Sequence, residues 1–185
     1  MINKKFALLI CDLQTKTLPN LFNNNEVVYN VNKLLYMKKY IPEISIAVKS
    51  EFIPNKLGYI DPSINGANID LTYTKNTYSM LTPQLSQYLK INKINNIILT
   101  GMETQWCINK TTLDLAKTYN VHIPADAIGN SLNLHKNKYN LDMLKYNGAH
   151  ITSTDFLICS FLNNYNQTRS KKYLNIIKSE NSKQF

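Results

Sequence analysis

The chain has 185 residues and a formal net charge of +9, from 21 lysines and arginines against 12 aspartates and glutamates. Its hydrophobic fraction of 44% excludes a disordered or collagen-like chain. A chain of this length buries roughly 70% of its unfolded surface, enough for a core without disulfides. Cys11, Cys107 and Cys159 are an odd number, too few for a secreted disulfide framework, and each lies in an apolar stretch. We therefore expect one domain, 1–185, in a reducing, cytoplasmic compartment.

The N-terminus has two lysines before an apolar run, but the run ends at Asp12 and no small-residue cleavage site follows. No stretch approaches the roughly 20 apolar residues of a membrane-spanning helix. The sequence therefore predicts a soluble protein without a membrane partner, and the apolar run 6–11 is interpreted as a strand.

Apolar runs alternate with helical patterns along the chain, which is typical of crossover units that feed a parallel sheet. The expected strands are 6–11, 44–48, 72–74, 95–101, 121–125 and 149–153. Helices are expected around 27–35, 83–89 and 106–119. A further helix is expected to end at Gly148, and another to begin at a cap at Thr154. Residues 166–185 are expected to form a C-terminal helix and tail. The irregular stretch 50–73 fits either a binding or lid segment or a plain surface loop.

The basic charge has two interpretations. A positive surface is typical of nucleic-acid-binding proteins, but Arg169 is the only arginine, and the lysines are scattered among asparagines. Polyanion sites favour arginine and cluster their basic residues on one face. The sequence favours a solvated lysine surface, so a nucleic-acid partner is not expected.

Three reactive side chains are predicted to lie where strands of the sheet end. Asp12 follows the first strand, Lys75 follows the strand 72–74, and Cys107 lies beyond Gly101 at the start of a helix. Ligands of open parallel sheets bind outside the carboxyl ends of the strands. A thiol reacts as the thiolate, which a helix N-terminus and a lysine ammonium both stabilise. Asp12 would accept the thiol proton and Lys75 would balance the charge, a pattern that indicates nucleophilic catalysis.

Each of these residues also has an ordinary structural interpretation. A cysteine among apolar residues is commonly a small core side chain. An aspartate after a strand often forms a turn, and a lysine in a polar segment is usually solvated. The three histidines, His122, His135 and His150, form no short ligand motif, so neither a metal nor a cofactor is expected.

Five segments together resemble the isochorismatase-like cysteine hydrolase superfamily, which includes nicotinamidases and N-carbamoylsarcosine amidase. In chain order they are ALLICDLQ, SEFIPNKLG, KNTYSML, ILTGMETQWCINKTTLDLAKTYNVHIPADAI and GAHITSTDFLI. Their order and spacing are most similar to the isochorismatase-domain-containing 2 type. The resemblance implies a three-layer α/β/α, Rossmann-like fold with a six-stranded parallel sheet. It also implies a homo-oligomer, commonly a dimer or tetramer.

For the site, the resemblance implies a catalytic triad of Asp12, Lys75 and Cys107, and a non-proline cis peptide bond between Met102 and Glu103. The backbone N–H groups of Glu103 and Cys107 would form the oxyanion hole. Residues near the triad in sequence are candidate substrate-binding residues, with ordinary packing as the alternative, slightly favoured for Tyr78: Gln14, Tyr78, Gln105 and Trp106. Gln105 stands where close relatives usually have histidine, which bears on substrate preference.

Two features separate the chain from named activities of the superfamily. Nicotinamidases of this fold bind a divalent metal through an Asp-x-His motif and a following histidine, whereas residues 50–60, SEFIPNKLGYI, contain no histidine. True isochorismatases typically have glycine at the position of Cys107, so the retained thiol favours a covalent route.

The leading prediction is a metal-independent cysteine hydrolase that acts on a small-molecule substrate, an amide or related carbonyl compound, through a covalent thioester. The first alternative is a catalytically silent family member that serves as a binding or interaction module. RNA binding or ribonuclease activity is a third reading, motivated only by the +9 charge.

Overall fold

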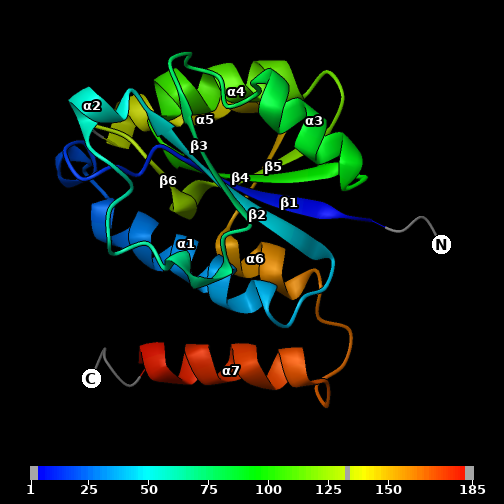
Figure 1. The fold of residues 1–185 in the computed structure, drawn as a ribbon. Coiled ribbons are helices and arrows are strands. Elements are labelled where there is room, and N and C mark those ends of the chain that lie inside the picture. The colour runs from blue at the N-terminus through cyan, green and yellow to red at the C-terminus, as the bar shows by residue number, and fades with distance from the viewer. Residues whose placement is uncertain (1–3, 132–133, 182–185) are drawn as a thin grey trace.

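The computed structural model describes the backbone of residues 4–131 and 134–181 (Figure 1). Its sheet has parallel strands in the order β3-β2-β1-β4-β5-β7, with a short strand β6 beside β4. The strands are β1 (Phe6–Cys11), β2 (Ile44–Phe52), β3 (Leu71–Lys75), β4 (Asn96–Met102), β5 (Asn120–Pro124), β6 (Ile128–Gly129) and β7 (Ala149–Thr152). The six predicted strands are all present, and the two-residue β6 is additional.

Helices cover both faces of the sheet, which gives the predicted three layers (Figure 1). They are α1 (Asn24–Lys38), α2 (Pro54–Leu57), α3 (Pro83–Ile91), α4 (Asn109–Leu115), α5 (Leu134–Tyr146), α6 (Thr154–Cys159) and α7 (Thr168–Asn181). The α3, α4 and α5 helices lie on one face, α1 and α6 lie on the other, and α7 lies outside α1 and α6 (Figure 1). Within the described residues, no helix is long and apolar enough to cross a membrane.

The central strands are buried from both sides, as expected of a parallel sheet between two helical layers. All residues of β1 and β4 are buried. Along β1, Leu8 and Ile10 face the α1 side, whereas Ala7, Leu9 and Cys11 belong to the core cluster under α3 and α4. This two-residue alternation places the Cys11 thiol on the same side of the sheet as Cys107.

Several predicted boundaries were wrong. The stretch 50–73 is not free of structure: β2 continues to Phe52, α2 and a 3-10 turn at Gly66–Asn68 follow, and β3 begins at Leu71. The predicted helix 106–119 is a π-helical turn, η3 (Thr104–Ile108), continued by α4 only to Leu115. The cap of α6 is Ser153 rather than Thr154, because the Ser153 hydroxyl accepts the Phe156 N–H at 3.2 Å. Cys159 is exposed although its neighbours are apolar.

The carboxyl ends of β1 and β4 are paired, with Cys11 beside Gly101. Gly101 has φ +109°, and a Cβ there would stand 2.1 Å from the Cys11 carbonyl oxygen. Only glycine fits this position, because it has no Cβ and tolerates positive φ. The glycine thereby lets the chain after β4 approach the end of β1, where Asp12 begins the next turn.

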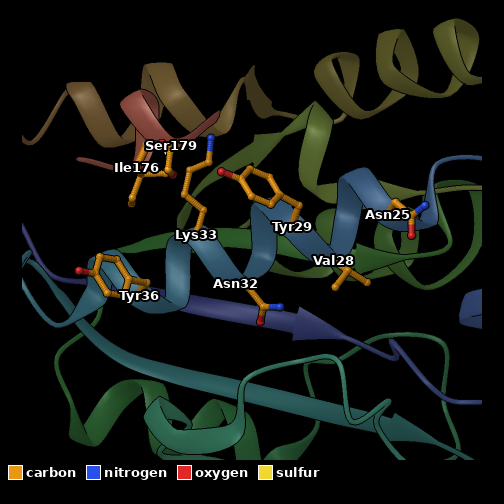
Figure 2. A pocket seen from close by; sticks show the side chains of 8 residues that line it. All are labelled: Asn25, Val28, Tyr29, Asn32, Lys33, Tyr36, Ile176 and Ser179. Atoms are coloured by element: carbon orange, nitrogen blue, oxygen red, sulfur yellow. Dashed lines mark hydrogen bonds between the residues drawn. The ribbon is translucent and has the colours of Figure 1, made fainter. Parts of the chain in front are cut away.

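The C-terminal helix is fastened by a buried lysine. The side chain of Lys33 on α1 is 4% exposed and forms ion pairs of 2.9 Å with Asp155 of α6 and Glu180 of α7. The Tyr29 hydroxyl also donates to Glu180. Figure 2 shows Tyr29 and Lys33 rising from α1 toward Ile176 and Ser179 of α7, around a groove of about 440 Å³. These ion pairs and the hydrogen bond explain why α7 lies beside α1. The assignment of the whole chain to one domain stays a prediction.

A histidine pair toward the amino end of the sheet makes stability depend on pH. The rings of His122 and His150 stack at 5.1 Å, and burial chiefly, with His150 and Lys4, lowers the pKa of His122 below 6.5. The unfolded chain therefore binds the proton first, so this contribution to stability is complete above about pH 6.5 and is lost as pH falls. We expect the free energy of unfolding in urea to fall between about pH 7 and pH 5, and His122→Phe to reduce that slope. An unchanged slope in the variant would contradict this assignment.

Candidate active site

The structure brings Asp12, Lys75 and Cys107 together at the carboxyl edge of the sheet. Asp12 follows β1, Lys75 ends β3, and Cys107 lies in η3 after β4. Lys75 Nζ lies 2.7 Å from Asp12 Oδ2 and 3.7 Å from Cys107 Sγ. All three residues are buried, with exposures of 5–6%. An acid, an ammonium and a thiol therefore share one desolvated cluster, as the sequence predicted for their positions.

The Lys75 ammonium is fixed by several acceptors. It donates to the Thr77 and Tyr78 carbonyls at 3.1 and 3.2 Å as well as to Asp12, and it lies 4.5 Å from the centroid of the Phe52 ring. Burial alone would lower the pKa of Lys75, but the Coulombic attraction of Cys11, Asp12 and Cys107 in their ionised forms, with the hydrogen bond to Asp12, outweighs it and raises that pKa. Lys75 is therefore a cation at neutral pH, held where it stabilises negative charge on Cys107.

Asp12 is held by residues that the sequence interpretation missed. The Ser50 hydroxyl at the end of β2 donates to Oδ1 at 2.7 Å, and the Cys11 thiol donates to Oδ2 at 3.3 Å. Asp12 adopts φ +53°, a left-handed conformation that aspartate tolerates better than most residues. Strained positions of this kind concentrate at functional sites. The register that pairs Cys11 with Ser50 across β1 and β2 is the reason Ser50 reaches the carboxylate.

Cys11 adds a second thiol to the cluster. It is fully buried, and burial chiefly, then the neighbouring Cys107 side chain and the charge of Asp12, raises its pKa well above the ordinary value. Cys11 is therefore protonated at neutral pH. Its sulfur, the Cys107 sulfur and a carboxylate oxygen of Asp12 lie within 4.8 Å of one another.

The chain before Cys107 turns sharply. The Met102–Glu103 peptide bond is cis, as the resemblance implied. The Glu103 carbonyl accepts the N–H groups of Trp106 and Ile108 at 3.0 and 3.2 Å, which winds η3 around Cys107. The oxyanion-hole roles of the Glu103 and Cys107 N–H groups stay predictions.

Gln105 and Glu103 form a polar cluster at the start of η3. Gln105 Nε2 donates to Glu103 Oε2 at 2.7 Å, and the Ser131 hydroxyl donates to the same oxygen at 2.7 Å. Among the residues that the structure describes, Gln105 Oε1 is buried without a hydrogen-bond partner. An unpaired buried amide oxygen costs free energy unless a donor reaches it. Gln105 therefore retains one acceptor for a substrate donor, and its binding role stays a prediction.

Aromatic rings border the cluster. Tyr78 and Trp106 stack with ring centroids 5.7 Å apart, and Tyr78 also lies 5.4 Å from Phe52. Tyr78 is 51% exposed and Trp106 54% exposed, so neither is a core residue. Half-exposed flat rings beside a buried thiol provide an apolar surface for a ligand or a partner.

Gln14, a predicted substrate-binding residue, is fully buried and fastens the backbone. Its Oε1 accepts the Phe52 N–H at 2.8 Å, while its Nε2 donates to the carbonyls of Phe52, at 3.1 Å, and Gly58. These contacts join the turn after β1 to the segment that follows β2. A direct contact between Gln14 and substrate stays a prediction.

We expect Gln14→Leu to lower the free energy of unfolding by about 2 kcal/mol, because backbone groups of Phe52 and Gly58 lose their partner. Urea denaturation measures the change, with Gln105→Leu as a control of smaller expected effect, since the described hydrogen bond of Gln105 Nε2 goes to the Glu103 side chain rather than to the backbone. A Gln14→Leu protein with unchanged stability would contradict the fastening role.

The residues do not fit the divalent metal site of nicotinamidases. The segment after β2 carries no histidine, and Glu51 Oε1 is occupied by the Ile60 N–H at 3.1 Å. His122 and His150 lie on β5 and β7, toward the opposite end of the strands. The side chain of His135 is not among those that the structure describes. Cys11, Asp12 and Cys107 offer donors to a thiophilic metal, but the Lys75 ammonium already pairs with Asp12 and repels a divalent cation.

The layers and the cluster define a class: an α/β/α protein with a cysteine, a lysine and an aspartate gathered where parallel strands end. Residues 6–156 match the family described as Isochorismatase domain. The chain therefore belongs to the isochorismatase-like hydrolase family, as the sequence motifs indicated.

Relatives agree with this membership over nearly the whole chain. Isochorismatase family protein 2A of Dictyostelium discoideum is 32% identical, over 92% of this chain and 88% of that protein. Isochorismatase domain-containing protein 2 of Xenopus laevis is 31% identical, over 92% of this chain and 82% of that protein. The solved structure of MAR1 ribonuclease from Caenorhabditis elegans is similar, with a TM-score of 0.84 and 25% identity, covering 96% of this chain and 91% of that chain.

Proposed function

We propose that the protein is a metal-independent hydrolase that uses Cys107 as a nucleophile on a small amide or related carbonyl compound. One observation carries the proposal: a buried ammonium lies 2.7 Å from a carboxylate oxygen and 3.7 Å from a thiol sulfur. A carboxylate alone would oppose ionisation of the thiol, and an ammonium between them offsets that repulsion. This is the arrangement that an activated cysteine requires.

In the proposed cycle, Asp12 accepts the proton of Cys107 and the thiolate attacks the carbonyl carbon. The N–H groups of Glu103 and Cys107 stabilise the oxyanion, an effect that can contribute about 10² to 10³ in rate. Asp12 then protonates the departing amine, which leaves a thioester on Cys107. Asp12 next takes a proton from water, and the resulting hydroxide attacks the thioester. The C–S bond breaks, the carboxylic acid leaves, and the Cys107 thiolate recovers its proton from Asp12. Lys75 stays charged throughout.

The experiment is a search for the acyl-enzyme. Pure protein is mixed with a panel of small aromatic and aliphatic amides and activated esters, quenched in acid within seconds, and weighed by intact mass spectrometry. An acyl mass on the peptide that contains Cys107 supports the covalent route. The covalent route would be contradicted if a substrate is hydrolysed without an acyl mass ever appearing on Cys107 and the Cys107→Ala variant still hydrolyses it.

We further propose a homo-oligomer in the cytoplasm. Two half-exposed rings beside the site support a partner copy, and three cysteines that are all free thiols support a reducing compartment. Light scattering of the pure protein tests the assembly; a monomer at micromolar concentration would contradict it.

A second candidate is ribonuclease activity, which the similarity to the Caenorhabditis elegans MAR1 ribonuclease and the net charge of +9 favour. Asp12 and Lys75 would then act as the base and the charge stabiliser at a phosphate, and Cys107 would not be needed. Cleavage of a labelled RNA that survives Cys107→Ser but not Asp12→Asn supports this candidate. No cleavage by the wild-type protein at low salt, where phosphate contacts are strongest, excludes it. A protein inactive in both assays is expected to be the binding module.

A further inference from the structure

The proposed cycle leaves one reactive group at the site unused. Cys11 ends β1, is fully buried, and places its sulfur within 4.8 Å of the Cys107 sulfur. Its thiol donates to Asp12 Oδ2 at 3.3 Å, and the same oxygen accepts a hydrogen bond from the Lys75 ammonium. Both thiols belong to the same core cluster, on the α3 and α4 side of the sheet. A second thiol so near a nucleophile has a chemistry of its own.

We propose that Cys11 and Cys107 form a reversible disulfide after a peroxide oxidises Cys107, and that this disulfide switches the hydrolase off. The inference rests on the proposed function in one respect: Cys107 must ionise beside Lys75. In its oxidised form the protein holds neither the thiolate nor the proton path from Cys107 to Asp12.

Two balanced steps make the bond. The Cys107 thiolate attacks one oxygen of hydrogen peroxide, the O–O bond breaks, and the products are a Cys107 sulfenic acid and hydroxide. The hydroxide becomes water by taking from Asp12 the proton that Cys107 gave up, which leaves the carboxylate free. The Cys11 thiol then gives its proton to Asp12, and its sulfur attacks the Cys107 sulfur. The sulfenic hydroxyl leaves as water after taking that proton from Asp12. Overall, one peroxide is reduced to two waters and two thiols are oxidised to one disulfide.

The geometry assigns a different part to each cysteine. Burial and the Asp12 charge raise the pKa of Cys11, so Cys11 does not compete for the peroxide. Lys75 lies 3.7 Å from the Cys107 sulfur, which makes Cys107 the one that reacts first. The Asp12 carboxylate, already hydrogen-bonded to the Cys11 thiol, is placed to deprotonate it.

The approach required is small. A disulfide needs the two sulfurs at about 2.05 Å, a distance that side-chain rotation and a slight shift of the loosely wound η3 turn can supply from within 4.8 Å. Cys159 is excluded as a partner, because it is exposed on α6, on the other face of the sheet. The disulfide would also protect Cys107 from irreversible oxidation to the sulfinic acid.

The test needs no substrate. Reduced full-length protein is treated with a few equivalents of hydrogen peroxide, free thiols are blocked with N-ethylmaleimide under denaturing conditions, and trypsin peptides are weighed without reduction. We expect Phe6–Lys16 joined to Ile94–Lys110, lighter by two hydrogens than their sum, and a return of Cys107 alkylation after dithiothreitol. Cys11→Val should abolish the joined peptide and convert Cys107 to sulfinic acid that dithiothreitol does not reverse. Cys159→Ser should change neither result.

The outcomes separate this inference from the proposed function. Rapid alkylation of Cys107 by iodoacetamide with no joined peptide, and equal sulfinic acid in wild type and Cys11→Val, overturns the disulfide and leaves the nucleophile in place. A Cys107 that reacts with neither iodoacetamide nor peroxide overturns both. A joined peptide that contains Cys159 instead of Cys11 also overturns the inference.

Discussion

Replacing Cys107 with alanine is expected to lower kcat/KM on any amide or ester that the protein hydrolyses by about 10⁴-fold or more, because the attacking atom is gone. The fold should survive: one sulfur is removed from a residue 6% exposed, at a cost of about 1 kcal/mol. Steady-state hydrolysis and urea denaturation measure the two effects separately.

The matched control for this substitution is Cys159→Ala, which removes an exposed thiol far from the cluster. It should leave both kcat/KM and stability unchanged. A Cys107→Ala protein that keeps its activity within tenfold of wild type would show that the chemistry does not pass through the thiol.

Replacing Lys75 with methionine is expected to lower the free energy of unfolding by about 3 to 5 kcal/mol, because the buried Asp12 carboxylate loses its counter-ion. The difference in free energy of unfolding between wild type and Lys75→Met should depend on pH. Since the folded-state pKa of Lys75 is raised, its contribution is complete below the ordinary value of about 10.4 and is lost as pH rises above it. Denaturation at neutral and at alkaline pH measures both effects.

The control is the double variant Lys75→Met with Asp12→Asn, in which no charge stays buried without a partner. It should recover part of the lost stability, and the difference from the summed single changes gives the coupling of the pair. A Lys75→Met variant that is as stable as wild type would mean that the ion pair contributes nothing to the fold.

The fold was predictable because its strands alternate with helices along the sequence and are buried on both faces. Short apolar runs such as FALLIC and NIILTG predict central strands that are buried on both faces. The boundaries around 50–73 failed for a physical reason: the end of β2 mixes polar Ser50 and Glu51 into the strand, because these side chains serve the site and the next loop. Hydrophobic patterning does not detect a strand residue kept for its hydroxyl.

The positions of Asp12, Lys75 and Cys107 were also predictable, since each lies at or beyond the carboxyl end of a strand of one parallel sheet. Ser50 and Cys11 were missed. Ser50 contacts Asp12 from 38 residues away through the register of β1 and β2, which sequence patterns do not give. The sequence interpretation placed Cys11 in an apolar stretch and gave it no role. Its two-residue alternation with Leu9 puts it on the Cys107 side, a signal that could have identified it.

Gln14 shows that closeness in sequence to a catalytic residue does not by itself predict a substrate-binding side chain. It lies two residues beyond Asp12, yet all of the described hydrogen bonds of its side chain go to the backbone of Phe52 and Gly58. The tight turn at Asp12, with its positive φ, points consecutive residues in different directions. Tyr78 and Trp106 differ, because stacking leaves both rings half exposed beside the thiol.

The central claim is that Lys75 and Asp12 activate Cys107, and the rate of iodoacetamide alkylation at each cysteine from about pH 5 to pH 9 tests it most directly. At neutral pH, Cys107, although 6% exposed, should react faster than the exposed Cys159, and Lys75→Met should remove that advantage. A Cys107 that reacts more slowly than Cys159 at every pH, with no change in the Lys75→Met variant, would contradict the account.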